Sequence, residues 1–138
     1  MSDFNELNQQ VMEEFRRNGG KVGGASEGVP LLILAATGAK SGKPRETPVV
    51  YRPDGDRYVI FATKAGAPEN PSWYYNVKAN PEVTVEVGTE RFTAAATELV
   101  GKERERLWEA QKAEYSQFAE YEETAAGRVI PLVALTRA

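Results

Sequence analysis

Residues 47–64 read TPVVYRPDGDRYVIFATK and contain two segments rich in β-branched and aromatic residues. These segments, residues 47–52 and 57–64, predict two strands. Between them, Pro53-Asp54-Gly55-Asp56 contains the Asp-Gly pair that favours a tight hairpin turn. The stretch therefore predicts two neighbouring antiparallel strands, and the chain continues this pattern on both sides.

The remaining chain supplies further strands and helices in an order that suits a small barrel. Apolar or alternating segments predict strands at residues 31–36, 82–87, 91–99 and 129–136. Helical patterns predict helices at residues 3–18, 71–79 and 101–123, the last with a break near Ser116. The polar stretch from Thr37 to Pro48 predicts a loop. Hairpin connections dominate this order, so we expect an α+β fold. It would be a barrel of about six mostly antiparallel strands flanked by helices, in one domain over residues 1–138.

The composition excludes several kinds of chemistry. The chain has 138 residues and a net charge of −3, which disfavours generic nucleic-acid binding. It has no cysteine, so a disulfide, a thiol nucleophile and a Cys-ligated zinc are excluded. It has no histidine, so Ser-His-Asp hydrolysis and His-ligated metals are excluded as well, and we expect no metal site. An enzyme with this composition uses Tyr, Asp, Glu or Lys, or a cofactor that supplies the chemistry.

The first predicted helix has one apolar face, and two interpretations of that face stay open. Its apolar residues recur at helical spacing and are Phe4, Leu7, Val11, Met12 and Phe15. The favoured interpretation packs this face on the barrel, and the other gives a weak peripheral contact with a membrane. A glycine-rich loop is expected from Gly19 to Gly28. The start of the chain lacks a basic and then apolar leader, so we expect a cytoplasmic location.

Positive charge gathers in one part of this acidic chain. Residues 31–64 contain six lysines and arginines against three acidic residues. Within them, the stretch TGAKSGKPR at residues 37–45 has three cations and no anion. Glycines let backbone N–H groups approach an anion and the cations supply charge, so the stretch suits an anionic ligand; the alternative is a solvated loop that aids solubility. The stretch is not a P-loop, because only three residues separate Gly38 from Gly42 and Pro44 occupies the Ser/Thr position.

The aromatic residues form two groups. Trp73, Tyr74 and Tyr75 lie on the short predicted helix, and Tyr115, Phe118 and Tyr121 follow helical spacing in a polar segment. Core packing is the commoner role of such a helical group. The alternative is that these rings cover a flat ligand, with a phenol available as a proton donor.

Several motifs in order resemble the deazaflavin (coenzyme F420)-dependent nitroreductase family of actinobacteria, within the split β-barrel flavin-binding superfamily. The resemblance covers nearly the whole chain. Its motifs are Asn18-Gly19-Gly20-Lys21, TGAKSGKPRETP at residues 37–48, KAGAPENPSWY at residues 64–74, and Arg128-Val129-Ile130-Pro131. The resemblance implies a split β-barrel and hydride transfer from reduced F420 to an electrophile such as a quinone, a nitroaromatic or an activated enone. The partner it implies is a small-molecule substrate. The protein itself would be a monomer or a homodimer.

The resemblance also implies a set of site residues. Those that would bind the cofactor are Lys40, Ser41, Gly42, Lys43, Arg45, Thr47, Pro48, Thr63, Lys64, Gly66, Ala67, Ser72 and Trp73. Tyr115 and Tyr121 would be the catalytic residues, with the proton coming from one of them or from water, and with Phe118 they would line the substrate pocket. The chain departs from the family pattern at Ala39, Val50, Ala65 and Phe118, where the family often has a basic residue, an aromatic, a glycine and a tyrosine.

Two alternatives to an F420-dependent enzyme stay open. One is a related enzyme that binds FMN, although a short phosphate needs fewer cations than residues 37–45 offer. The other is a non-catalytic protein that carries the cofactor or a lipid, and it predicts ligand binding without turnover.

Overall fold

The computed structural model describes residues 3–21 and 30–138, with the side chains from residue 6 onward. Most of the expected glycine-rich loop, with Gly23, Gly24 and Gly28, lies outside the described residues, as does the side chain of Phe4. The strands are β1 (Leu31–Thr37), β2 (Pro44–Asp54), β3 (Arg57–Phe61), β4 (Glu82–Val87), β5 (Glu90–Leu99) and β6 (Leu132–Arg137). The helices are α1 (Asp3–Arg17), α2 (Ser72–Ala79), α3 (Gly101–Glu114) and α4 (Ser116–Thr124), with a 3-10 turn η2 (Lys64–Gly66).

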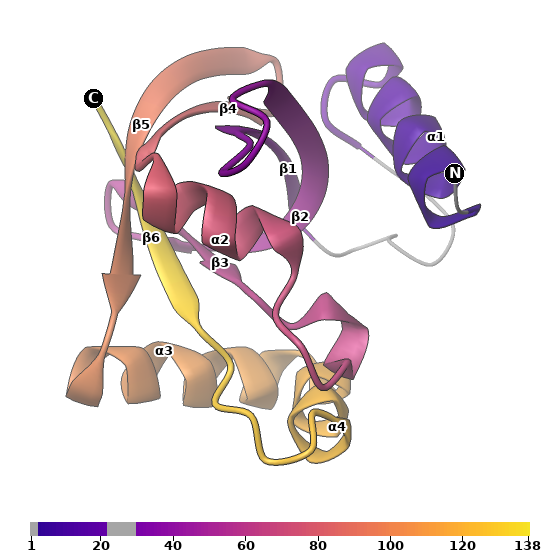
Figure 1. Ribbon diagram of the computed structural model, residues 1–138. Coiled ribbons are helices and arrows are strands. Elements are labelled where there is room, and N and C mark those ends of the chain that lie inside the picture. The colour runs from indigo at the N-terminus through magenta and orange to yellow at the C-terminus, as the bar shows by residue number, and fades with distance from the viewer. Residues whose placement is uncertain (1–2, 22–29) are drawn as a thin grey trace.

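The strands close into a barrel in the order β1-β2-β3-β6-β5-β4, and every neighbouring pair is antiparallel (Figure 1). The predicted α+β barrel is therefore confirmed. The hairpin from β2 to β3 turns at Gly55, whose φ of +63° explains the glycine there. This hairpin pairs Tyr51 with Ile60 and Asp54 with Arg57.

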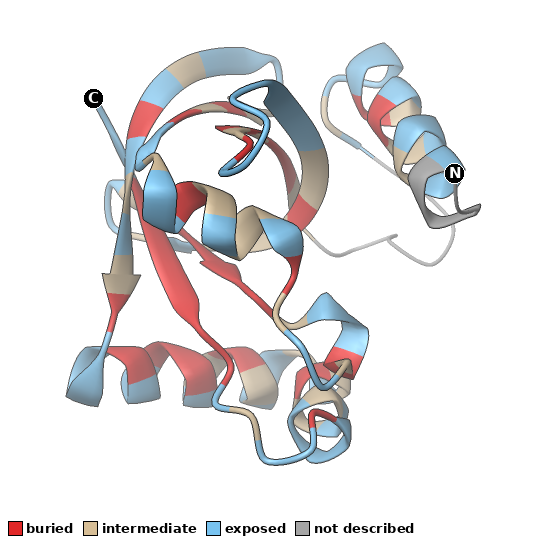
Figure 2. Cartoon of the chain, in the orientation of Figure 1, coloured by how far each residue is buried: buried red, intermediate tan, exposed pale blue. Residues whose placement is uncertain are grey.

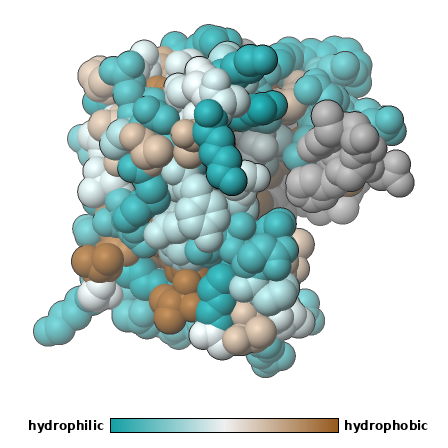
Figure 3. All heavy atoms as spheres, in the orientation of Figure 1, coloured by the Kyte–Doolittle hydropathy of each residue, from teal (hydrophilic) through white to brown (hydrophobic). Residues whose placement is uncertain are grey.

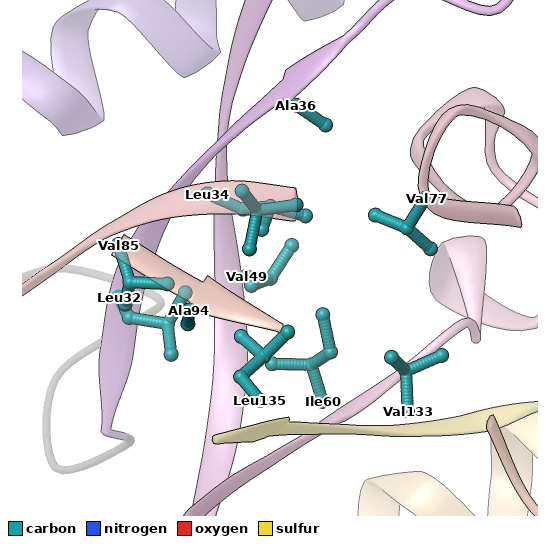
Figure 4. Close-up of a cluster of buried hydrophobic side chains, with 11 residues drawn as sticks. Leu32, Leu34, Ala36, Val49, Ile60, Val77, Val85, Ala94, Val133 and Leu135 are labelled. Atoms are coloured by element: carbon teal, nitrogen blue, oxygen red, sulfur yellow. The ribbon is translucent and has the colours of Figure 1, made fainter. Parts of the chain in front are cut away.

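Strands β3 and β6 are buried on both faces because the barrel has a core inside and a second core outside. Ile60, Val133 and Leu135 point into the barrel interior with Leu32 and Leu34 (Figure 4). Val77 reaches the same cluster from α2 and so closes one end of it.

The intervening residues of β3 and β6 form the outer core. Val59, Phe61 and Leu132 face outward and pack with Trp108 and Phe118 of the two late helices. Figure 2 shows the buried residues of α3 on its side toward the barrel. This alternation follows the two-residue period of a strand. It explains why the β6 segment is a continuous apolar run.

Several predicted boundaries were wrong by a few residues. Strand β2 begins at Pro44, so the predicted loop over residues 37–48 is really a turn followed by strand, with Pro48 paired to Ile33. Proline lacks a donor, and Pro48 is tolerated because β2 pairs with β3 only from Tyr51 onward. Strand β3 ends at Phe61 rather than residue 64, and β6 begins at Leu132 rather than residue 129.

The helical predictions were closer to the structure. The helix expected over residues 101–123 breaks at Tyr115, whose φ of −127° is extended, so α3 and α4 are separate. The break lies next to Ser116, as predicted. None of the helices in the described part of the chain is long and apolar enough to span a membrane.

Helix α1 packs on the outside of the barrel. Met12 and Phe15 are 1% exposed and contact Ile33, which points outward from β1. Arg16 donates hydrogen bonds to Glu46 of β2 at 2.7 Å and Glu86 of β4 at 2.6 Å. Met12 and Phe15 of the apolar face are therefore used against the barrel, which confirms the favoured interpretation for this part of the helix, whereas Leu7 is 56% exposed.

Candidate active site

The turn between β1 and β2 presents its lysines to solvent on a closed backbone. The Gly38 N–H donates to the Lys43 carbonyl at 2.8 Å, and the Gly42 N–H donates to the Gly38 carbonyl at 2.9 Å. Gly42 has a φ of +69°, a conformation that glycine adopts without strain. Lys40, Ser41, Gly42 and Lys43 are all exposed. The backbone thus holds the turn while leaving both ammonium groups free.

The cations of this turn have no acidic partner. Within the described part of the chain, Lys40, Lys43 and Arg45 form no ion pair within 4.0 Å. In contrast, Arg16 and Arg57 each pair with two carboxylates. Three cations within six residues and without partners form a surface that attracts an anion.

Helix α2 connects this turn to the next candidate segment. The Asn76 side chain accepts a hydrogen bond from the Ala39 N–H at 2.9 Å, so the middle of α2 anchors the turn. The other end of α2 follows η2 in the chain (Figure 1). Trp73, in the first turn of α2, is half-buried against the barrel core, and Ser72 beside it is exposed. The two predicted cofactor segments therefore border the same helix.

The turn η2 holds three consecutive residues with positive φ. The φ angles are 47° at Lys64, 54° at Ala65 and 80° at Gly66. No described atom accepts a hydrogen bond from the N–H of Lys64 or Ala65, whereas Gly66 N–H donates to the Thr63 carbonyl. Successive amides in a turn of this kind form an anion-binding concavity. The Lys64 ammonium lies 2.9 Å from Glu69, and its hydrogen bond lowers the pKa of that carboxyl.

Helix α4 lies directly against η2. The Thr124 hydroxyl donates to the Gly66 carbonyl at 3.0 Å. A Cβ added to Gly66 would lie 2.1 Å from the Thr124 hydroxyl and 3.0 Å from the Tyr121 Cα. Only glycine fits this contact, so the predicted cofactor turn and the predicted substrate helix touch. Among the described residues, no hydrogen bond or ring contact joins the turn at Lys40 to α4.

The three predicted pocket aromatics differ in exposure. Phe118 is 2% exposed and packs on Phe61 and Trp108, so it belongs to the outer core. Tyr115 and Tyr121 are half-buried, with ring centroids 6.3 Å and 5.3 Å from Phe118. These two phenols are the members of the group that remain accessible.

A polar cluster beside Tyr115 was missed at the level of the sequence. Arg52 of β2 donates to the Glu114 carboxylate at 2.7 Å and to the side-chain amide oxygen of Gln111 at 3.4 Å. The pKa of Tyr115 is raised above its ordinary value by burial and by the negative charge of Glu114, and the positive charge of Arg52 offsets only part of this rise. Tyr115 therefore stays protonated at neutral pH. Gln111 is fully buried and its amide nitrogen has no partner among the described residues.

Other contributors were missed because contacts, rather than patterns, reveal them. Arg128 lies in a motif that carried the family resemblance and Asn76 lies two residues after another, but their partners are distant in sequence. Thr47 and Pro48, which the resemblance implied, lie on β2 in pairing with β1.

A groove of about 870 Å³ lies next to Arg128, since Asn70 and Val129 line it. It is lined by Tyr74, Leu99, Val100, Ile130 and others, and it includes none of the predicted site residues. Figure 3 shows hydrophobic surface on the lower part of this face, and Val100 and Val129 are 74% and 73% exposed. Three carboxylates and three cations line it, so it lacks the net positive charge of the turn near Lys40.

Residues 7–137 match the family of F420H(2)-dependent quinone reductases. The chain belongs to this family. An F420H(2)-dependent quinone reductase of Mycobacterium tuberculosis strain H37Rv is 39% identical over 127 residues, which cover 89% of this chain and 85% of the relative. The family resemblance inferred from the sequence motifs is thereby confirmed.

Two solved structures are similar to this F420H(2)-dependent reductase, and the first supports the same assignment. One, described as an F420-H2 dependent reductase, is 40% identical with a TM-score of 0.69, covering 77% of this chain and 93% of its own. The other, described as a domain-swapped dimer, is 34% identical with a TM-score of 0.71. The match covers 97% of this chain and 99% of that chain.

The residues of this reductase fit the charge of the cofactor. Coenzyme F420 carries a phosphate and an anionic glutamyl tail. The described residues offer three cations that form no ion pair among them, Lys40, Lys43 and Arg45, and the η2 turn, where the amides of Lys64 and Ala65 have no acceptor. Within the described residues, no group of three acidic side chains is placed to hold a metal ion.

Proposed function

We propose that the chain reduces a quinone to the hydroquinone, with the cofactor bound along the β1–β2 turn and η2. The observation that carries this proposal is the contact between η2 and α4. It places the free amides of Lys64 and Ala65 next to the helix that contains Tyr121. A cofactor-binding turn and a substrate-facing helix are then parts of one site.

The chain's own cations hold the anionic part of the cofactor. Three cations neutralise the glutamyl tail: Lys40, Lys43 and Arg45. Lys64 leaves its ion pair with Glu69 and binds the phosphate instead. The free amides of Lys64 and Ala65 also bind the phosphate. Trp73 and Ser72 border the ring region from the start of α2. The bound, reduced cofactor supplies the hydride for the reaction.

Tyr115 and Tyr121 hold the proton that completes the reduction. One hydride and one proton convert a quinone to a hydroquinone, so a donor beside the substrate oxygen is required. The raised pKa of Tyr115 keeps its phenol protonated, and Arg52 stabilises the negative charge left on that phenol oxygen. Solvent returns the proton to the phenol.

A ligand titration tests the cofactor. Ligand-free protein is titrated with F420 and separately with FMN, and the fluorescence of tryptophan and of the cofactor is followed. Trp73, next to the site, is expected to respond, whereas Trp108 is buried in the outer core. Saturable binding of F420 without FMN binding is expected; tight binding of FMN alone would contradict the assignment of Lys40, Lys43 and Arg45.

A second test addresses the phenols. The double variant Tyr115→Phe, Tyr121→Phe is expected to bind F420 normally and to lose at least tenfold in quinone reduction. The control is Tyr58→Phe, which removes a phenol that packs on the barrel core. Unchanged reduction in the double variant would mean that water alone supplies the proton.

The oligomeric state is also part of the proposal. The sequence predicts a monomer or a homodimer, and the relative described as a domain-swapped dimer supports the dimer. Light scattering after size exclusion is expected to give twice the chain mass of 15.2 kDa. A mass equal to one chain would leave the site within a single barrel.

A further inference from the structure

Arg128 places its guanidinium under the segment that contains η2. It donates to the carbonyl of Ala62 at 2.8 Å, of Thr63 at 2.9 Å and of Ala67 at 2.8 Å. It also donates to the side-chain oxygen of Asn70 at 2.6 Å. One side chain thus binds both ends of the turn between Ala62 and Asn70.

The charge of Arg128 has no carboxylate partner. None of the described acidic side chains lies within 4.0 Å of it, and burial lowers the pKa of its guanidinium. An arginine nevertheless stays protonated. Buried charges in proteins are usually paired with an opposite charge. Here peptide carbonyls stabilise the cation directly, the charge of Glu69 acts on it from beyond 4.0 Å, and the positive charge lies beneath η2.

These bonds fix the direction of the amides above. In a trans peptide the carbonyl and the following N–H point in opposite directions. Because the Thr63 carbonyl points to Arg128, the Lys64 N–H points away from it. That N–H has no acceptor among the described residues. The same arrangement holds Lys64 and Ala65 in their left-handed conformations.

We infer that Arg128 is a positioning residue of the phosphate site, which turns the Lys64 amide outward and adds positive charge behind it. This inference rests on the proposed function, because it takes η2 as the phosphate-binding turn. Arg128 does not touch the ligand itself. In the chain, Arg128 comes shortly after the end of α4. Ala126 and Gly127, which connect the two, have φ angles of 57° and 81°. The chain therefore connects the phosphate turn to the substrate helix through this residue.

The test compares two ligands that differ in the phosphate and in the tail that the phosphate carries. The first is F420, and the second is the same deazaflavin with its ribityl chain but without phosphate and tail. Both are titrated by fluorescence against wild type and Arg128→Lys, which keeps the charge but loses the forked donors. We expect the Kd for F420 to rise at least tenfold and the Kd for the phosphate-free deazaflavin to change less than twofold.

Two further variants keep the test decisive. Arg104→Lys is the matched control, since Arg104, which is buried, also donates to a backbone carbonyl, that of Ile130 at 2.8 Å. Neither Kd should change in this variant. Asn70→Ala removes one partner of Arg128 and should shift F420 binding in the same direction by a smaller factor, even if Arg128→Lys fails to fold. Circular dichroism and thermal melting monitor folding.

The outcomes separate the two claims. Equal weakening of both ligands, or unchanged binding of F420, overturns the role of Arg128 while leaving the proposed function intact. Failure of the wild-type protein to bind F420 overturns the proposed function and this inference with it.

Discussion

Lys64 and Ala65 adopt conformations that side chains avoid, and they do so at the site. A left-handed conformation costs about 1–2 kcal/mol for a residue with a Cβ. The φ angles of 47° and 54° place both residues in this region, next to Gly66 at 80°. Such strain persists only where the surroundings over-determine it. Here the hydrogen bonds of Arg128 and the Thr124 contact maintain it, and its result is a pair of outward amides.

The strain at Ala65 leads to a prediction about stability. Ala65→Gly removes the Cβ clash, so the free energy of unfolding should rise by about 0.5–1 kcal/mol after the extra backbone entropy of glycine is included. Ala67→Gly is the matched control, because Ala67 is extended with a φ of −64° and should lose stability. Denaturant unfolding measures both. A loss of stability in both variants would contradict the left-handed conformation of Ala65.

At the scale of elements, the β1–β2 turn supplies charge and α2 fixes its place. The prediction is that Lys40→Ala, Lys43→Ala and Arg45→Ala each weaken F420 binding by up to about fivefold, the range of exposed ion pairs, and that the triple variant weakens it at least tenfold. Added salt should weaken wild-type binding more than binding by the triple variant, since salt screens exposed charges.

The control for this charge prediction lies on another element. Lys102 of α3 is exposed and has no ion pair among the described residues, so Lys102→Ala should leave the Kd for F420 unchanged. An equal effect of Lys102→Ala would mean that net charge, rather than the β1–β2 turn, controls cofactor affinity.

The sequence predicted elements well where one physical signal was sufficient. The Asp54-Gly55 turn and the helix break at Tyr115 follow from local backbone preferences, and both are present. The start of β2 was misjudged because Pro44 and Pro48 suggest a loop, whereas the missing strand neighbour at Pro48 makes proline acceptable.

The site could be predicted only in part, for a related reason. Cations near residue 40 stand out in composition, so charge alone pointed to an anionic ligand there. The roles of Arg128 and Thr124 depend on contacts with residues 58 to 66 positions away. No local pattern encodes such contacts, and only the folded chain reveals them.

At the scale of the whole molecule, the barrel carries α1 on one part of its outer surface and α3 with α4 on another (Figure 1). The late helices complete the outer core and the site, while α1 packs on the outward face of β1. Arg16 connects α1 to β2 and β4 at once. The attachment of α1 therefore depends on carboxylates as well as on Met12 and Phe15.

This attachment makes stability depend on pH in a predictable direction. The hydrogen bond from Arg16 lowers the pKa of Glu86 below its ordinary value of 4.5. A carboxyl with a lowered pKa in the folded state stabilises the fold above the unfolded pKa, and this contribution is lost as the pH falls through the folded pKa. Wild type should therefore lose stability below about pH 4.5, and Glu86→Gln, less stable at pH 7, should lose less on acidification.

Denaturant unfolding at several pH values measures this loss of stability. Glu82→Gln on the same strand is the control, because the exposed Glu82 forms no ion pair among the described residues. An identical loss in wild type and Glu86→Gln would show that the Arg16–Glu86 contact contributes nothing to folding, and that Met12, Phe15 and the Arg16–Glu46 pair hold α1 on the barrel.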